Sequence, residues 1–216
     1  AGTLWRAPAG EPGPAEPYAE GLRQPWDLAG DGETVWVAMA GAHQIWRFAP
    51  PAPPRPWAGL GWEGLRDGDL RGAFFAQPSG LAFDGRHLWV ADSEASAIRR
   101  VDVAAGRVET VAGSGLFDFG DSDGGPGEAR LPHPLAVAWD ARRSRLLVAD
   151  TYNGKVRRLE PASGRLATLA SGLHEPGGLA WDPEGDRLFV CDTNDHALRL
   201  LHPEGGGGAV WSHEMP

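Results

Sequence analysis

The chain repeats one unit four times, and this repetition limits the possible folds more than any other feature. Each copy opens with a proline, at Pro25, Pro78, Pro134 and Pro176. An apolar stretch follows 12 or 14 residues later, centred on Val37, Val90, Val148 and Val190. A branched apolar residue then recurs at one spacing, as Ile45, Ile98, Val156 and Leu198. Copies of this regularity predict a repeat architecture.

Within each copy the pattern is typical of β-strands. Apolar stretches such as LAF and LAW are followed by D-G or E-G turns and then by LWVAD or LFVCD. A third strand (AIRRVD, KVRRLE or ALRLLH) and a fourth (RVETVAG, RLATLAS or GAVWSH) complete the unit. Four antiparallel strands in about 42 residues, the distance from Pro134 to Pro176, describe a propeller blade. No segment shows a sustained helical period.

We therefore predict an all-β fold, a β-propeller of four-stranded antiparallel blades in a single domain over residues 1–216. The blades are expected at 24–76, 77–132, 133–174 and 175–216. Residues 1–23 are expected to form half a blade, because TLWRAP aligns with QIWRFAP and EPYAEG with RPWAG. An open ring would expose two strand edges. We expect about one and a half further blades before this sequence, or a partner that completes the ring; a five-bladed ring is the alternative.

Composition excludes several classes of function. The 31 glycines and 19 prolines lie between short apolar runs and indicate many tight turns. A net charge of −9 disfavours nucleic acid as a partner. No apolar run reaches the roughly 18 residues of a membrane span, and no signal peptide is visible, so no membrane association is expected. The single Cys191 fits a reducing compartment and a cytoplasmic location. It fills the slot of Ala38, Ala91 and Ala149, and we expect a packed residue there rather than a reactive thiol.

The core V-A-D-[ST]-x-N-x-[KIV]-R, present in LLVADTYNGKVRRL and with variations in FVCDTNDHALRLL, resembles the NHL repeat. The order of the four copies is similar to that in NHL proteins with a thioredoxin-like domain before a six-bladed propeller, and includes Met39 where the other copies carry Asp. The resemblance covers nearly the whole chain. It implies the later part of a six-bladed NHL propeller with a thioredoxin-like fusion partner, and it implies architecture more firmly than mechanism.

In propellers, the loop entering the first strand and the loop between the second and third strands lie on one face, which we call the loop face. Polar residues stand just before the repeat prolines and in the second loops, and Asp27 lies near the start of an innermost strand. An ordinary solvated rim is the alternative to a binding role for each of them. The candidates for the binding face are Gln24, Asp27, His43, Gln77, Glu94, His133, Tyr152, Asn153, Glu175, Asn194 and His196.

Other recurrent residues favour structural roles. The aspartates Asp92, Asp150 and Asp192 are expected to accept backbone N–H bonds in the turn that follows each of them, rather than to form a metal ring. The tryptophans Trp36, Trp89, Trp139 and Trp181 are expected to pack between blades. The third-strand arginines are expected on exposed strand faces, paired with acids. They are Arg47, Arg99, Arg100, Arg157, Arg158 and Arg199.

The stretch FGDSDGGPGEARLPHP, residues 119–134, resembles the start of a calcium loop. The twelfth residue from Asp121 is Pro132 rather than the bidentate Glu that such a loop needs. The stretch also has a sibling in RDGDLRGAFFAQP, where Phe75 stands three residues before its proline, as Leu131 does. We therefore interpret both as one repeated connection between blades, anchored by that apolar residue.

The leading functional hypothesis is a non-enzymatic scaffold that contacts another protein or a fused domain through its loop face. It needs no cofactor and no catalytic residue; the oligomeric state is left open. The alternative is a channel-site enzyme of the metal-dependent lactonase or lyase type found among six-bladed propellers. There Asp27, His133 and Glu175 would bind a divalent cation. A third possibility is a role in redox chemistry. This chain lacks any C-x-x-C, so it would only assist a thioredoxin-like domain that carries one.

Overall fold

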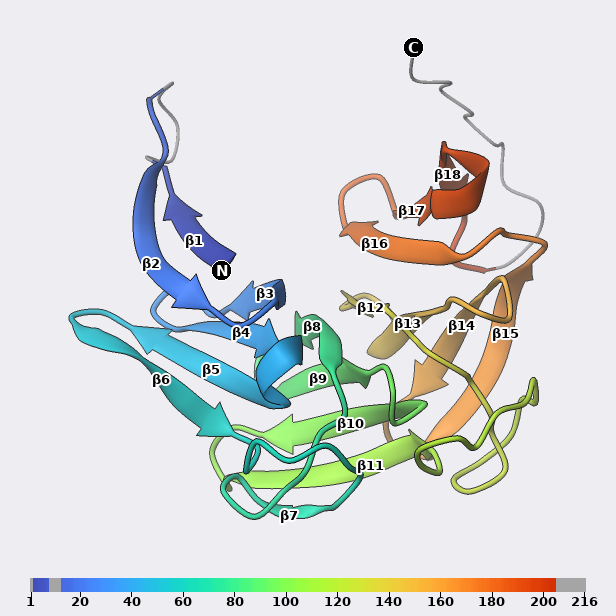
Figure 1. Ribbon diagram of the computed structural model, residues 1–216. Helices are drawn as coiled ribbons and strands as arrows, with labels where there is room; N and C mark the ends of the chain where they lie inside the picture. Colours follow the sequence, from blue (N-terminus) through green and yellow to red (C-terminus); the bar gives the residue numbers. More distant parts are fainter. Residues whose placement is uncertain (1, 8–12, 205–216) are drawn as a thin grey trace.

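In the computed structural model, which describes residues 2–7 and 13–204, the chain forms five antiparallel sheets arranged in an arc (Figure 1). The first sheet contains β1 (Gly2–Arg6) and β2 (Glu16–Leu22). The second contains β3 (Pro25–Gly30), β4 (Val35–Met39), β5 (Gln44–Ala49) and β6 (Ala52–Ala58). The third contains β7 (Gly68–Asp69), β8 (Pro78–Phe83), β9 (His87–Asp92), β10 (Ala97–Asp102) and β11 (Arg107–Gly113).

The fourth sheet contains β12 (Ala136–Asp140), β13 (Arg145–Asp150), β14 (Lys155–Glu160) and β15 (Arg165–Ser171). The last contains β16 (Pro176–Asp182), β17 (Arg187–Asp192) and β18 (Ala197–Leu201). Two 3-10 turns, η1 (Ala40–Ala42) and η2 (Thr193–Asp195), lie between second and third strands. The innermost strands β3, β8, β12 and β16 contact one another in that order. This arrangement confirms the predicted β-propeller fold; the expected strand GAVWSH lies outside the described residues.

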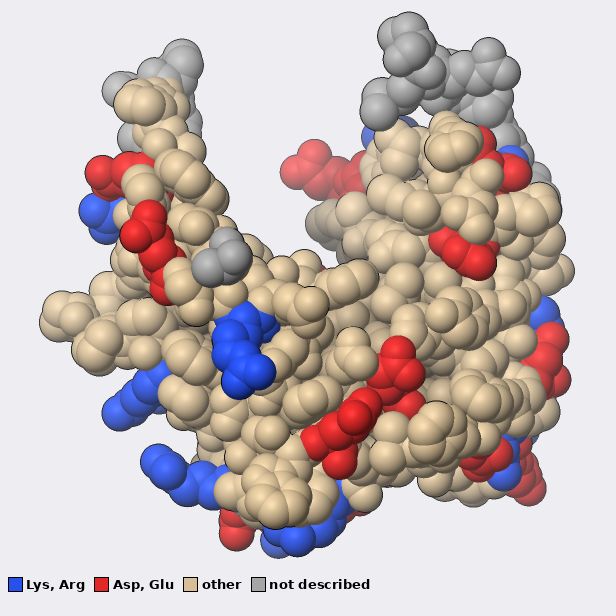
Figure 2. Space-filling model, viewed as in Figure 1, with Lys and Arg blue, Asp and Glu red and all other residues tan. Residues whose placement is uncertain are grey.

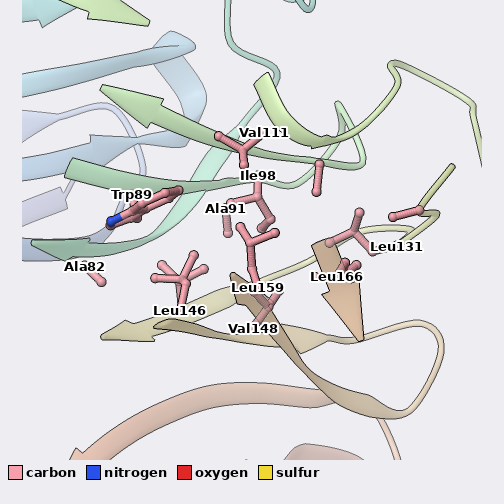
Figure 3. Close-up of a cluster of buried hydrophobic side chains, with 13 residues drawn as sticks. Ala82, Trp89, Ala91, Ile98, Val111, Leu131, Leu146, Val148, Leu159 and Leu166 are labelled. Atoms are coloured by element: carbon pink, nitrogen blue, oxygen red, sulfur yellow. The ribbon is translucent and has the colours of Figure 1, made fainter. Parts of the chain in front are cut away.

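The hydrophobic core lies between successive sheets. Figure 3 shows one cluster, in which Trp89 and Ile98 of one sheet meet Leu146 and Leu159 of the next. Trp89 also stacks on Trp139, with ring centroids 6.3 Å apart and planes inclined by 8°. Burying each large side chain contributes roughly 1.5–3 kcal/mol. The prediction that tryptophans pack between blades is confirmed for this pair.

Hydroxyl groups add a polar link between neighbouring blades. The Ser93 hydroxyl donates to the carbonyl oxygen of Pro134 at 2.7 Å, and the Thr151 hydroxyl donates to that of Pro176 at 2.8 Å. Each hydroxyl directly follows the V-A-D aspartate, and each acceptor is the repeat proline of the next blade. The residue after the aspartate therefore joins each of these blades to the following one.

The V-A-D aspartates are buried and bind the connection before their blade, not the following turn as predicted. Asp92 accepts the backbone N–H of Ala76 at 2.7 Å, and its other oxygen accepts from Arg99 at 2.8 Å. Asp192 accepts the N–H of His174 at 2.6 Å in the same way. The prediction was wrong because the returning connection, distant in sequence, runs closer to the carboxylate than the local turn does.

Two copies depart from this pattern. Met39 and Trp46 occupy the positions of Asp92 and Arg99, so an apolar pair replaces the ion pair in that blade. In the fourth sheet, one oxygen of the buried Asp150 has no hydrogen-bond partner among the described residues. Pro132 stands where the other copies supply an N–H, and proline has none to donate.

The third-strand arginines are not all exposed. Arg99 and Arg157 are fully buried, which corrects the predicted exposed faces, although both pair with acids as expected. Arg99 donates to the Phe74 carbonyl at 2.8 Å and to Asp67 at 3.0 Å, so the connection covers its guanidinium. A buried guanidinium needs such partners to offset the loss of hydration.

The two sibling connections run along the outer strand of the blade they enter. Residues of β7 pair with β11, and Gly124 exchanges backbone hydrogen bonds with Leu166 of β15. Asp121 of the calcium-like stretch pairs with Lys155 at 2.5 Å and also with Arg157, so side-chain cations already neutralise it. Phe75 and Leu131 are fully buried, which supports their predicted anchoring role.

The arc is open, with β1–β2 and β16–β18 standing apart at its two ends in Figure 1. On the last sheet Phe189 and Leu198 are 38% and 52% exposed, and Cys191 is also exposed. The packed environment predicted for Cys191 is therefore wrong. The fourth sheet packs on the face of β17 that carries Leu188 and Val190, and no described sheet packs on the face that carries Cys191. Within the described residues, no helix has the length and apolar character needed to cross a membrane.

Candidate functional site

On the loop face, each blade is entered through a residue in left-handed backbone conformation. Gln24, Gln77, His133 and Glu175, each directly before a repeat proline, have φ values between 50° and 54°. Non-glycine residues adopt this region rarely, at a cost of roughly 1–2 kcal/mol. The same conformation in four copies places these side chains equivalently at the entry to each blade. The predicted polar set is thus a repeated geometric feature.

In three blades the second loop is held against the entry of the same blade. The N–H of Ala40 donates to the Gln24 carbonyl at 3.1 Å, and the N–H of Glu94 donates to the Ala76 carbonyl at 3.0 Å. Asn194 and His174 are joined in the same way at 3.0 Å. These bonds fix the loops to the strands, so the face is a scaffold with defined positions for its side chains.

Three predicted residues from two blades meet at one point. The His133 ring stacks on Tyr152, with centroids 4.5 Å apart and planes inclined by 10°. The His133 Nδ1 atom lies 3.4 Å from a Glu94 carboxylate oxygen. Separately, the N–H of Gln77 donates to His43 Nδ1 at 3.2 Å, which leaves the His43 proton on Nε2 when the ring is neutral. Glu94, His133 and Tyr152 form the densest polar contact of the predicted set.

The other candidates divide into bonded and free groups. The Asn153 amide donates to the Gly120 carbonyl and to Asp150, both at 3.0 Å, so it is held in place by structure. The remaining four are exposed and form no side-chain hydrogen bond with another described residue. They are Gln24, Glu175, Asn194 and His196.

Asp27, His133 and Glu175, the residues of the metal-site alternative, are not gathered into one site. The Asp27 carboxylate accepts the N–H groups of Leu81 and Leu28, each at 2.8 Å. Burial raises the pKa of Asp27, and these two N–H groups act in the opposite direction. Both of its oxygens are therefore occupied by backbone.

Within the described residues, one group of side chains does have the spacing of metal ligands: His174, Asp192 and Asp195. Arg199 pairs with both of its carboxylates, so a fixed cation already occupies the position that a metal ion would need. The group includes Asp192, a V-A-D aspartate that also accepts the backbone N–H of His174 and so holds the connection before its blade.

One small cavity lies at the channel mouth. Its volume is about 30 Å³, and Trp26, Gln77, Ser79, Ser93 and His133 contribute to its lining. Sites for drug-sized ligands usually measure about 300–1,000 Å³. The hydroxyls of Ser79 and Ser93 lie 2.5 Å apart, and both can donate to backbone carbonyls. Neither hydroxyl is bonded to a general base within the described residues.

Comparisons with known proteins agree with this architecture. The NHL repeat model matches residues 75–100. NHL repeat-containing protein 2 of Homo sapiens is 37% identical over 188 residues, covering 73% of this chain and 26% of that protein. The chain belongs to the NHL-repeat β-propellers. It spans about a quarter or less of the length of the curated relatives it matches.

Solved structures resemble this NHL propeller in fold alone. A crystal structure of a nidogen/laminin complex matches with a TM-score of 0.69 at 18% identity, covering 88% of this chain and 65% of that one. Virginiamycin B lyase from Staphylococcus aureus, with quinupristin, matches with a TM-score of 0.63 at 13% identity, covering 90% and 58%. Propellers of this shape thus occur both in a protein complex and in an enzyme.

The structure adds a group of loop-face residues of this NHL propeller that sequence reasoning missed. We call Leu60, Trp62, Phe117 and Phe119 the aromatic rim. Trp62 is 69% exposed and Phe117 is 81% exposed. They lie on the two connections, which Figure 1 shows in front of the blades. Large apolar residues between glycines, as in GLGWEG and GLFDFG, were the signal that could have identified them.

The aromatic rim rests on a common support. Leu65 and Leu116, one from each connection, pack against Ala76, Ala95 and Ala97 beneath them. Asp118, between the two phenylalanines, pairs with Arg130 at 3.0 Å. Inward Leu116 and Asp118 thus alternate with outward Phe117 and Phe119. The exposed rings project from a backbone that is anchored on both sides.

Phe117 also has an unusual backbone conformation, with φ at 65°. For a bulky residue this is a genuine outlier that costs roughly 1–2 kcal/mol. Exposed rings gain little from burial, so the fold receives no compensation from the Phe117 side chain itself. Backbone strain of this kind tends to be retained at functional sites.

Charge on this face is uneven. Figure 2 shows a strip of acidic side chains on this face, with basic side chains to its left and along the lower edge of the molecule. Among the described residues, no lysine or arginine forms an ion pair with Glu63, Glu94 or Glu175. On the opposite face several turn arginines are paired, as Arg143 is with Asp186 at 2.7 Å. Glu63 and Glu94 are thus free of direct arginine or lysine partners among the described residues, and Arg66, exposed on the same connection as Glu63, contacts the Gly72 carbonyl rather than a carboxylate.

Proposed function

We propose that this NHL propeller is a non-enzymatic scaffold whose loop face binds another protein or another domain. The observation that carries the proposal is the aromatic rim: exposed rings on an anchored backbone, one of them in strained conformation. Exposed apolar patches of this kind mark interaction surfaces, and aromatic residues are enriched at the energetic centres of interfaces.

The partner surface extends beyond the aromatic rim. Tyr152, stacked on His133, adds a further exposed ring, and Glu94 adds a carboxylate beside it. Tyrosine beside polar groups suits an interface because one side chain offers both apolar area and a hydrogen bond. Several candidates predicted from the sequence thus belong to the proposed surface, together with the rim.

Two further proposals concern the setting of this surface. The chain covers 26% of the human relative, which leaves room in such a protein for other domains. A thioredoxin-like domain in the same polypeptide is one partner that we propose, and a cytoplasmic location remains a prediction.

A paired-face crosslinking experiment tests the proposal. A photoreactive amino acid is placed at Phe119 or at Tyr152 on the loop face, and at Arg142 on the opposite face as the matched control. The protein is expressed in its own cells in the form in which it naturally occurs. The proposal expects discrete crosslinked species from the loop-face positions and few from Arg142. Equal crosslinking from both faces would refute it.

The enzyme alternative is tested separately. Calorimetric titration with calcium and zinc should show no stoichiometric binding that depends on Asp27 and His133, because the Asp27 oxygens accept backbone N–H groups. Tight binding that is abolished by Asp27→Ala together with His133→Ala would favour a channel-site enzyme of the lactonase or lyase type.

A further inference from the structure

We infer that the loop face recognises a cationic, arginine-bearing peptide segment of its partner. This inference rests on the proposed function and specifies the chemistry of the partner. Three observations carry it together: the exposed rings of the aromatic rim, the unpaired carboxylates beside them, and the shared support that holds both in place.

The rings offer faces to a planar cation. Trp62 and Phe117 are 69% and 81% exposed, on connections whose inner residues Leu65 and Leu116 share one apolar cluster. A guanidinium stacks on such faces through cation–π attraction, most strongly on tryptophan. The protein already uses this contact internally, where the Arg66 guanidinium lies 4.1 Å from the centre of the Phe74 ring.

The carboxylates supply the charge that an arginine needs. Glu63 directly follows Trp62, and Glu94 adjoins Ala95 of the cluster that supports the aromatic rim. Neither forms an ion pair with an arginine or lysine among the described residues; Glu94 contacts only His133, at 3.4 Å. Carboxylates bind guanidinium groups in a bidentate geometry. A surface with free carboxylates beside free rings is complementary to arginine.

Charge elsewhere on the molecule is consistent with this assignment. The net charge is −9, so the protein attracts cationic segments over a distance set by ionic strength. Carboxylates of the opposite face, such as Asp182 and Asp186, are paired with arginines. These two carboxylates are therefore less available to a basic segment than those of Glu63 and Glu94, which have no arginine or lysine partner among the described residues.

The test uses three labelled twelve-residue glycine–serine peptides, which carry four arginines, four glutamates or four leucines. Fluorescence anisotropy with the full chain measures their binding. We expect the arginine peptide alone to bind, with a Kd on the order of 100 µM that increases as salt is added.

Two double variants then test the residues. Trp62→Ala with Phe117→Ala should weaken binding of the arginine peptide about ten-fold. Glu63→Gln with Glu94→Gln should also weaken binding and should reduce its dependence on salt.

Matched controls leave the loop face intact. Trp5→Ala removes a ring of the first sheet that is 57% exposed, and Glu184→Gln removes an exposed carboxylate from the opposite face. Both should bind the arginine peptide as the parent chain does. Binding that these controls weaken as much as the loop-face variants do would overturn the inference.

The outcomes separate this inference from the proposed function. If the leucine peptide binds and depends on Trp62 and Phe117, the loop face is an interface but the inference of an arginine-bearing partner is wrong. If the glutamate peptide binds best, that inference is also wrong. If no peptide binds, the inference fails, and loop-face crosslinking then decides the proposed function by itself.

Discussion

At the scale of single residues, the V-A-D aspartates show how one carboxylate organises a blade. Asp92 holds the returning connection through the Ala76 N–H and holds the third strand through Arg99. Met39 and Trp46 show that one blade replaces this ion pair with apolar contacts. The same two positions therefore hold either an ion pair, as with Asp92 and Arg99, or an apolar pair, as with Met39 and Trp46. The contribution of the ion pair to stability can be measured by substitution.

The first prediction concerns the buried pair. Asp92→Ala leaves the Arg99 guanidinium without its buried partner and should lower the free energy of unfolding by about 3–5 kcal/mol. Glu109→Ala, which breaks the more exposed pair with Arg100, should cost less than about 1 kcal/mol. Urea unfolding at pH 8 measures both. Equal losses would mean that the buried pair has no special role.

A second prediction concerns pH. Burial raises the pKa of Asp92 to about 7, and Arg99 acts in the opposite direction. A carboxyl whose pKa is raised by folding holds a proton that the unfolded chain has released. Its contribution to stability is therefore greatest below about pH 4 and declines as the pH rises towards 7. Asp92→Asn should flatten this decline in urea unfolding curves between pH 5 and 7; an unchanged slope would contradict the prediction.

Single-residue properties were the least accessible to sequence reasoning. Recurrence indicated a structural role for Asp92, but its partner Ala76 lies 16 residues earlier, so local turn chemistry suggested the wrong donor. The glycines at both ends of GLFDFG mark Phe117 as a loop residue, but they do not show which way its ring points. An apolar residue in a loop is usually an anchor, as the neighbouring Leu116 is, and the direction of each side chain depends on the folded connection.

At the scale of elements, strands and blades followed the sequence closely. Alternating apolar stretches and turn residues predicted the strands because both signals are local. The two connections between blades were predicted, but their pairing with the outer strands β11 and β15 was not. Gly124 lies along β15 through backbone hydrogen bonds, which any residue type can form, so the pairing left no side-chain signature.

The third prediction tests the link between blades. Thr151→Val leaves the Pro176 carbonyl without its hydroxyl donor and should cost about 1–3 kcal/mol. Thr193→Val, the same change at the exposed equivalent position, should alter stability by less than about 0.5 kcal/mol. Thermal unfolding of both variants measures the difference. A comparable loss at Thr193 would show that the hydroxyl does not act through the next blade.

At the scale of the whole molecule, the repeats determine which surfaces are covered. Residues equivalent to Phe189 and Leu198 are buried in the other blades, where the following sheet packs on them. Sequence reasoning placed Cys191 in a packed slot because it compared single copies. Burial of that slot depends on the next sheet, which is a property of the ring and not of the blade.

The fourth prediction uses this difference. Cys191 should react with a thiol reagent in the folded chain at a rate close to that of a free thiol. Ala149→Cys in a Cys191→Ser background places a thiol at the equivalent covered position and should react only on unfolding. Slow labelling of Cys191 would show that its sheet face is covered in solution.

The loop face is the surface on which the functional account depends. Three of its predicted residues, Glu94, His133 and Tyr152, contact one another, and the rim residue Phe117 combines high exposure with a left-handed backbone. If such a residue serves binding, folding should not require it. The central claim can therefore be tested on the free chain, before any partner is known.

The measurement is the free energy of unfolding of Phe117→Gly. Glycine adopts the φ of 65° without steric cost, which relieves roughly 1–2 kcal/mol of strain, while its greater unfolded-state entropy cancels about half of that gain. The account predicts unchanged stability or an increase of up to about 1 kcal/mol. A loss of more than about 1 kcal/mol would show that Phe117 is part of the folding core and would contradict the claim that the aromatic rim is kept for binding.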